Sequence, residues 1–286
     1  MNIGTTLQGI RKSRQLTQAN IAENIMTQGA YSKIEKSQLS INLDQFIPLI
    51  IKMNINLQEF SYILNGYQLS ERETLIKTFT SLEIANTDHL QQMLKAVKDY
   101  LFNNPEDQYI HFLQVIYEAF IILQQENNLE KARQMVAPIW RNLQILDDWY
   151  MNDFELLNAI LFLFPLEVAI EMTKTAERRL EKYTDFPYDV SYLHAYFRID
   201  LSFHYIEMRL FEECLTLLEE TELKFLHKMR PKIAAILFER KAICLFYLQR
   251  PYEVELEKIE QLLTIYKDED TKELLLKEFN LLTRNF

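Results

Sequence analysis

The stretch LTQANIAENIMTQGAYSKIEKS, residues 16–37, decides the fold of the first part of the chain. Each of its two apolar-periodic segments begins at a threonine, Thr17 or Thr27. Threonine is a favourable N-cap, because its hydroxyl accepts a hydrogen bond from an unpaired amide of the first turn. We therefore expect one helix from Thr17 to about Ile25 and a second over 27–36. Two helices joined by so short a turn have the spacing of a helix-turn-helix.

Apolar residues at helical spacing extend this pattern in both directions. One helix is expected before the quoted stretch, where Ile3, Leu7 and Ile10 recur, and two follow it, over about 42–53 and 56–64. Five short helices predict a compact bundle over residues 1–66, and Asn65-Gly66 marks its end.

All four glycines of the chain lie in this first part, at positions 4, 9, 29 and 66. Phosphate-binding loops and dinucleotide fingerprints need glycines, so residues 67–286 contain neither motif. Gly29 is unusual, because a glycine inside a helix costs about 1 kcal/mol relative to alanine. It either lets the helix start approach a partner closely or merely tolerates an exposed turn.

The quoted stretch resembles the helix-turn-helix of Cro/C1-type (XRE-type) DNA-binding domains. The matching positions are Leu16, Thr17, Gln18, Ile21, Ala22, Thr27, Tyr31, Ser32, Ile34 and Glu35. Two positions depart from the family pattern. Ser37 stands where the family usually has a glycine after the helix, so that turn is expected to differ or to be strained. Tyr31 is bulkier than the usual aliphatic residue, so the local packing must adjust.

The resemblance implies that the second helix of the motif enters the major groove of DNA. Gln28 and Lys33 would then read base edges, while the small residues Gly29 and Ala30 would allow a close approach. Gln18 and Ser32 are expected at phosphates, which position a module without specifying sequence. Arg11 either pairs with Glu35 inside the bundle, as in the family, or contacts a phosphate. Further candidates for phosphate contacts are Lys12, Arg14 and Lys36.

The charge distribution supports a DNA contact confined to the first part. Residues 1–66 hold six Lys/Arg and four Asp/Glu, whereas the remainder carries a net charge of −12 within the total of −10. An acidic body is repelled by a polyanion, so only the mildly basic first part suits nucleic acid.

The second part, residues 67–286, reads as helix pairs. Long helices are expected near 106–126, 148–164, 188–208 and 230–249, and each is followed by a partner helix that opens with a similar phrase. Leu129-Glu130-Lys131-Ala132 and Leu166-Glu167-Val168-Ala169 are two of these phrases. The phrases are similar to the second helix of a tetratricopeptide repeat (TPR), in a degenerate form. Such repeats stack into a right-handed superhelix whose concave face binds peptides. The expected fold class is therefore all-α.

Both parts together resemble the Rgg (GadR/MutR) family of regulators, within the RRNPP group of receptors for imported signalling peptides. NINLQEF (54–60) and DDWYMNDFELLNAILFLF (147–164) look like characteristic segments of that family. The resemblance implies a cytoplasmic homodimer that regulates transcription at a two-fold symmetric DNA site and binds a short peptide. The alternative is an XRE-type repressor whose repeats form a protein-binding scaffold without a peptide ligand.

The long helices supply the candidate peptide-binding residues. On the helix near 148–164, Asn152, Glu155 and Asn158 lie on one stripe, and asparagine can hold an extended backbone through both donors and acceptors. The other candidates are Tyr196, Arg198 and Arg240. For each of them the alternative is a solvated side chain or one paired with neighbouring acids.

No catalytic, metal or cofactor function is expected. The five histidines form no metal signature, and Asp200 and His204, four residues apart, more simply form a helical surface pair. Cys214 and Cys244 do not make a disulfide framework. Without a secretory signal or a membrane-spanning segment, the protein is expected in the cytoplasm.

Overall fold

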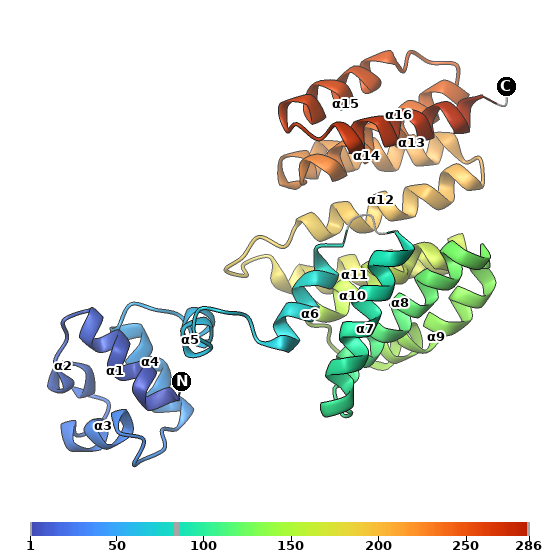
Figure 1. Cartoon of the computed structure of the whole chain (residues 1–286). Coiled ribbons are helices and arrows are strands. Elements are labelled where there is room, and N and C mark those ends of the chain that lie inside the picture. The colour runs from blue at the N-terminus through green and yellow to red at the C-terminus, as the bar shows by residue number, and fades with distance from the viewer. Residues whose placement is uncertain (1, 83–85, 285–286) are drawn as a thin grey trace. The chain divides into compact units, whose positions relative to one another are not determined.

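The computed structural model describes residues 2–82 and 86–284, and every regular element in these ranges is a helix (Figure 1). The chain divides into two compact units, Met1–Glu83 and Ile84–Phe286. The all-α fold expected from the sequence is confirmed.

The first unit contains the five expected helices and one more. Their bounds are α1 Ile3–Ser13, α2 Gln18–Ala22, α3 Gln28–Glu35, α4 Leu43–Lys52, α5 Leu57–Leu64 and α6 Glu71–Thr80. Helix α2 ends about three residues earlier than expected, because Asn24 adopts a left-handed φ of 61°. The amides of Ile25 and Met26 both turn back to the carbonyl of Ala22.

The predicted boundary at Asn65-Gly66 coincides with the end of α5, where Gly66 has a φ of 72°. The division into compact units falls later, so α6 belongs with the first unit. Its start lies beside α5, since Leu69 and Glu73 line the same shallow pocket as Glu59 and Tyr62.

Helices α1 and α3 approach closely at the amino terminus of α1. A Cβ atom on Gly4 would lie 2.1 Å from the carbonyl oxygen of Ile34, so only glycine fits there. Tyr31 is fully buried in the core of this unit, alongside Leu7 and Leu49.

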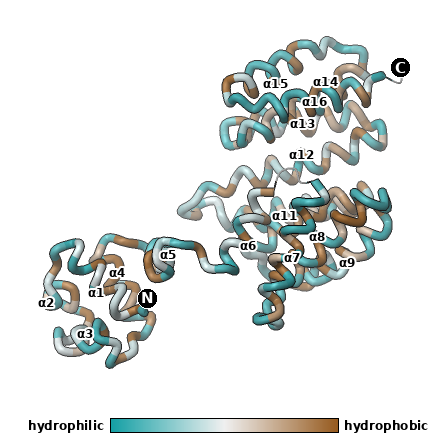
Figure 2. The backbone as a smooth tube through the Cα atoms, viewed as in Figure 1, coloured by the Kyte–Doolittle hydropathy of each residue, from teal (hydrophilic) through white to brown (hydrophobic). Residues whose placement is uncertain are grey.

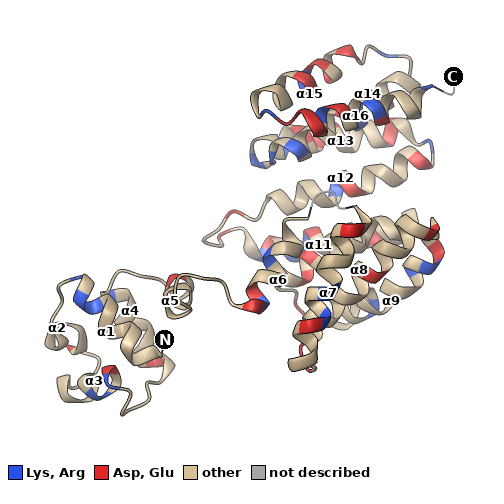
Figure 3. Cartoon of the chain, viewed as in Figure 1, with Lys and Arg blue, Asp and Glu red and all other residues tan. Residues whose placement is uncertain are grey.

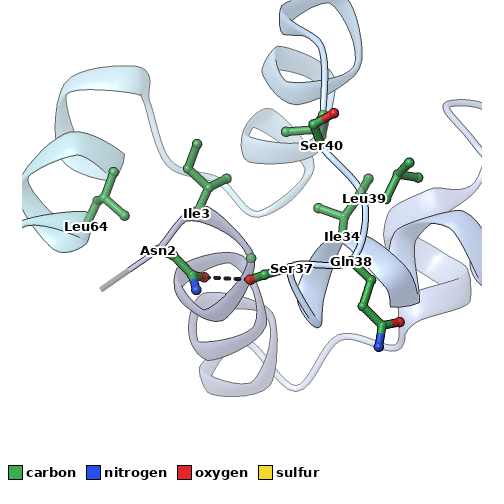
Figure 4. Close-up of a pocket in the computed structure, with 10 residues that line it drawn as sticks. Asn2, Ile3, Ile34, Ser37, Gln38, Leu39, Ser40 and Leu64 are labelled. Carbon is green, nitrogen blue, oxygen red and sulfur yellow. Dashed lines mark hydrogen bonds between the residues drawn. The ribbon is translucent and has the colours of Figure 1, made fainter.

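Ser37 adopts a left-handed φ of 59°, as its glycine-like position predicted. Its hydroxyl donates to Oδ1 of Asn2, the N-cap of α1, at 3.0 Å (Figure 4). Ser37 therefore has an unfavourable backbone conformation, but its hydroxyl links the end of α3 to the start of α1.

The second unit is a stack of antiparallel helix pairs, ordered along the chain from green to red in Figure 1. Its helices are α7 Thr87–Asn103, α8 Gln108–Glu126, α9 Leu129–Ile145, α10 Met151–Ile160, α11 Leu166–Leu180, α12 Tyr192–Glu207, α13 Phe211–Phe225, α14 Pro231–Tyr247, α15 Glu253–Ile265 and α16 Glu269–Thr283. Short 3-10 turns, Leu161–Leu163, Glu181–Tyr183 and Leu226–Lys228, follow α10, α11 and α13.

The four long helices predicted from the sequence correspond to α8, α10, α12 and α14, with later starts for two of them. Helix α10 starts at Met151 because the Asp153 carboxylate accepts the amide of Tyr150 at 2.8 Å and caps it there. Helix α12 starts at Tyr192, after a turn in which Asp189 accepts the amide of Ser191 at 3.0 Å.

Helices α8, α10, α12, α14 and α16 form a continuous row, because each packs against the next. We call this the inner row. Helices α9, α13 and α15 pack mainly against their neighbours in sequence. That the inner row lines a concave face, as the resemblance to tetratricopeptide repeats implies, stays a prediction. Hydrophobic segments alternate with hydrophilic ones along the helices (Figure 2), as pairwise stacking requires.

Candidate functional sites

The start of α3 is held in place by side chains from three helices. Thr27 caps α3 by accepting the amide of Ala30 at 3.2 Å, and Thr17 caps α2 by accepting that of Asn20 at 3.1 Å. Both caps confirm the helix starts predicted from the sequence. One face of α3 is buried through Tyr31, Ile34 and Glu35, which turns the opposite face outward.

A chain of hydrogen bonds runs from this outward face into the core of the bundle. Gln28 donates to Oε1 of Gln18 at 3.3 Å, and Gln18 donates to Oε2 of Glu35 at 2.8 Å. Glu35 in turn accepts Nε of Arg11 at 2.6 Å and Nη2 of Arg11 at 3.0 Å. Arg11 also donates to the carbonyl of Leu16 at 2.7 Å. The network fixes α1, α2 and α3 relative to one another.

Arg11 and Glu35 therefore form the internal ion pair that was one of the two roles expected for Arg11. Their side chains are only 11% and 0% exposed. Burial alone would raise the pKa of Glu35, but the hydrogen bonds from Arg11 and Gln18 outweigh it, so the pKa lies below its ordinary value. A phosphate contact by Arg11 stays a prediction.

The remaining DNA-binding candidates lie on or beside the outward face of α3. Gln28, Gly29, Lys33 and Lys36 are exposed, whereas Ala30 and Ser32 are half-buried. A Cβ atom on Gly29 would meet no atom within 4 Å, so the fold itself leaves that position open. A close approach to DNA at Gly29 stays a prediction.

Lys52 is a residue of this site that sequence reasoning missed. From the end of α4, its ammonium group donates to the carbonyls of Asn20 at 3.1 Å and Glu23 at 2.5 Å. A cation at a helix C-terminus neutralises the unpaired carbonyls, so Lys52 holds the turn between α2 and α3. No local pattern could reveal it, because it acts across about thirty residues of sequence.

The stripe predicted on α10 belongs to the inner row. Glu155 accepts a hydrogen bond from the hydroxyl of Tyr192 on α12 at 3.3 Å. Burial raises the pKa of Glu155, and the bond from Tyr192 partly opposes the effect. Oδ1 of Asn158 is buried and has no hydrogen-bond partner in the described part of the chain. Asn152, three residues before Glu155, is half-buried.

Tyr196 and Arg240 extend this surface along the row. The ring of Tyr196 meets that of Tyr192 edge to face, with centroids 5.2 Å apart. One turn later on α12, burial raises the pKa of Asp200 to about 7, and the charge of Arg240 opposes the effect. Arg240 reaches from α14 to α12, where it donates to the carbonyl of Ile199 and, at 3.0 Å, to Oγ of Ser202.

Arg198 lies apart from these residues. Its Nε donates to Glu177 of α11 at 2.5 Å and its Nη1 to Glu220 of α13 at 3.4 Å. The side chain thus points to the helices flanking α12 outside the inner row, and it has the acidic partners that the alternative reading of the sequence expected.

The described residues contain no group of three or more His, Cys, Asp or Glu side chains that could hold a metal ion. His204 is buried, and burial lowers the pKa of its imidazole. Within the same ranges, no helix is long and apolar enough to cross a membrane. Acidic residues are spread over the helices of the second unit, as Figure 3 shows.

No protein-family model and no curated protein matches the sequence. Solved structures do match over nearly the whole chain. PlcR of Bacillus thuringiensis, crystallised with the peptide PapR7 and DNA, is 19% identical with a TM-score of 0.69, over 95% of this chain and 98% of its own.

Two further solved structures also match over nearly the whole chain. Rgg2, the SHP pheromone receptor of Streptococcus dysgalactiae, is 17% identical with a TM-score of 0.69, over 98% of this chain and 100% of its own. ComR of S. thermophilus, solved with DNA and its signalling peptide ComS, is 13% identical with a TM-score of 0.63, over 98% and 99%.

This chain has their fold. The similarity spans both units, so the order of a helix-turn-helix bundle followed by helical hairpins, expected from the sequence, is confirmed.

Proposed function

We propose that this chain is a cytoplasmic transcriptional regulator of the Rgg type, which binds a two-fold symmetric DNA site as a homodimer and responds to a short signalling peptide. The observation that carries the proposal is the combination within one chain of an outward, internally braced α3 and an inner row with an unpartnered buried polar atom. The fold is that of proteins crystallised with DNA and peptides. The proposal includes no catalytic activity and no cofactor.

In the DNA complex, α3 would enter the major groove. Gln28 would pair with adenine and Lys33 with the acceptors of guanine. Ser32, Lys36 and Gln18 would contact phosphates, while Gly29 and Ala30 leave room for the backbone of the groove. Arg11 would support α3 from inside through Glu35.

In the peptide complex, an extended peptide would lie along the inner row. Asn152, Glu155 and Asn158 of α10 would bind its backbone, followed by Tyr196 of α12 and Arg240 of α14. Arg198 would join this site only by giving up its two carboxylate partners.

The scaffold alternative finds less support. A protein-binding face should carry a contiguous apolar patch. The four most exposed large apolar side chains of the second unit, Phe102, Ile145, Leu223 and Ile265, lie on four different helices, and only α16 exposes several together, Leu274, Leu281 and Leu282, among the described residues.

The test is footprinting on the DNA upstream of the gene and its neighbours, with and without synthetic peptides encoded by adjacent small reading frames. Gln28→Ala and Lys33→Ala should each weaken binding by roughly 1–3 kcal/mol at the matched base. Lys277→Ala, an exposed position in the second unit, serves as the charge-matched control.

Protection that neither α3 substitution alters would remove the assignment of base contacts. If every peptide left both the footprint and the melting temperature unchanged, the scaffold reading would replace the peptide receptor.

A further inference from the structure

Towards the carboxyl-terminal end of the inner row, α12, α14 and α16 enclose a pocket of about 220 Å³. Its walls are largely apolar and include Phe203 and Ile243, together with Leu282 of α16. Carboxylates also line it, among them Glu239 of α14 and Glu278 of α16.

Glu239 is the feature that needs an explanation. The residue is only 2% exposed, and its Oε1 atom has no hydrogen-bond partner among the described residues. A buried carboxylate without a partner is strongly unfavourable. Burial accordingly raises the pKa of Glu239 to about 8, and the negative charge of Glu278 adds to the effect. In the free protein the pocket therefore holds a proton on Glu239 at neutral pH.

Arg240, the next residue in the chain, does not supply the hydrogen bond that Oε1 of Glu239 lacks. Arg240 also lines the pocket, but its Nη1 donates to the carbonyl of Ile199 and to Oγ of Ser202 on α12. Its guanidinium carbon lies 5.9 Å from the ring centroid of Phe203. The charge of Arg240 lowers the pKa of Glu239 by less than burial raises it. Oε1 of Glu239 is left without a hydrogen-bond donor among the described residues.

We propose that this pocket binds a primary ammonium group of the signalling peptide together with the apolar carbon atoms next to it, with Glu239 as its main acceptor and Glu278 as a second negative charge. On binding, Glu239 releases its proton to the solvent, and the resulting carboxylate accepts a hydrogen bond from the ammonium at the oxygen that has no partner in the free protein. The proposal deepens the proposed function and rests on it, because the pocket lies on the same inner row as the peptide-binding residues.

The position of the pocket also determines how many peptide residues are needed to reach it from the stripe on α10. Neighbouring packed helices lie roughly 8–10 Å apart, so two steps along the row, from α10 to α14, span about 16–20 Å. An extended chain covers about 3.3 Å per residue, so about five or six residues reach from the stripe on α10 to Glu239.

The ammonium can belong to the amino terminus of the peptide or to a lysine. The test uses small probes for each source, each followed by NMR in a titration of the full chain. 4-Fluorophenylalaninamide carries the free α-ammonium on an apolar residue, and Nα-acetyl-lysinamide carries only the side-chain ammonium. N-acetyl-4-fluorophenylalaninamide keeps the apolar ring but has no charge.

At least one ammonium probe should bind, and the tighter of the two identifies the source. The uncharged probe should bind at least about tenfold more weakly, because a hydrogen bond between charged groups is lost. Glu239→Gln should reduce binding by at least about tenfold, and Glu278→Gln by less. The matched control, Glu260→Gln, removes an exposed carboxylate from α15 and should leave binding unchanged.

Equal binding of the charged and uncharged probes, equal binding by Glu239→Gln, or no binding of either ammonium would overturn the assignment. A thermal melt is the check that Glu239→Gln is folded. Glu278→Gln, at an exposed position of α16, provides a second variant outside the core. The probes involve neither DNA nor a natural peptide, so their failure leaves the footprinting test of the proposed function standing.

Discussion

At the scale of single residues, the first unit depends on two positions where backbone and side chain conflict. Gly4 must be glycine because α3 leaves no room for a Cβ atom. Ser37 keeps a Cβ atom at a left-handed φ, and the hydrogen bond of its hydroxyl to Asn2 offsets part of the strain. The family's usual glycine would avoid the strain but could not make the bond.

Substitutions at Ser37 should separate these two effects. Ser37→Ala keeps the strained backbone and loses the bond, so it should destabilise the protein by about 0.5–1.5 kcal/mol. Ser37→Gly loses the bond but relieves roughly 1 kcal/mol of strain, so it should be nearly neutral. Urea denaturation measures both, and a glycine variant as unstable as the alanine variant would contradict the explanation.

Glu239 should make the stability of the protein depend on pH. Its folded pKa of about 8 lies above the ordinary value of 4.5, so the folded state holds the proton more tightly than the unfolded state. Glu239 therefore destabilises the protein progressively as the pH rises from about 5 to 8, and by its full amount above that range. The charged or titratable groups around it are Glu278 of α16, Glu207 and Arg209 from α12 and the turn after it, and Arg240, Cys244 and Tyr247 of α14.

Glu239→Gln cannot titrate, so its melting temperature relative to the native protein should rise between pH 5.5 and pH 8.5. The full difference is a few kcal/mol at most, since each pKa unit corresponds to about 1.4 kcal/mol. Melts of Glu260→Gln over the same range control for surface charge. A gap between Glu239→Gln and the native protein that stays constant with pH would show that Glu239 is not a protonated buried group.

At the scale of elements, α10 carries a polar atom that the free protein leaves unmatched. Asn158→Ala removes the partnerless Oδ1 atom, so it should not lower the stability of the free protein. Peptide binding should nevertheless weaken by about 0.5–1.5 kcal/mol, because a hydrogen bond to the ligand is lost.

Calorimetric titration and thermal melts of the same variant test both halves of this prediction. Asn152→Ala on the same stripe is the natural comparison. Unchanged affinity in Asn158→Ala would remove that residue from the peptide site, and a large fall in stability would show that Asn158 has a structural role instead.

The elements themselves were largely predictable from the sequence, because capping residues and apolar periodicity are local signals. Thr17 and Thr27 marked the starts of α2 and α3, and the Arg11–Glu35 pair followed from the resemblance. Contacts across the fold were not predictable. The requirement for Gly4 depends on how closely α1 meets α3, and the direction of Arg198 depends on which helices flank α12.

At the scale of the whole molecule, each helix of the second unit packs against near neighbours in the stack, so stability should vary along it. Helix α16 ends the inner row and exposes Leu274, Leu281 and Leu282. Hydrogen exchange should therefore be fastest there and slower in α10 and α12. A bound peptide should protect α10 through α14 together, since it would bridge them.

Protection confined to one helix would contradict a ligand that spans the row, and uniform exchange in the free protein would contradict the graded stability. In the Glu239→Gln variant, the protection that the peptide induces should fall more at α14 than at α10.

The packing of each inner helix against the next also affects how the array can bend. Because each inner helix packs against the next, a small tilt at one contact would be passed on to the helices beyond it. The curvature of the array would then be the sum of the angles between neighbouring inner helices. A peptide bound at both α10 and α14 would fix two of these contact angles at once, α10 against α12 and α12 against α14, and so would select one curvature of the array.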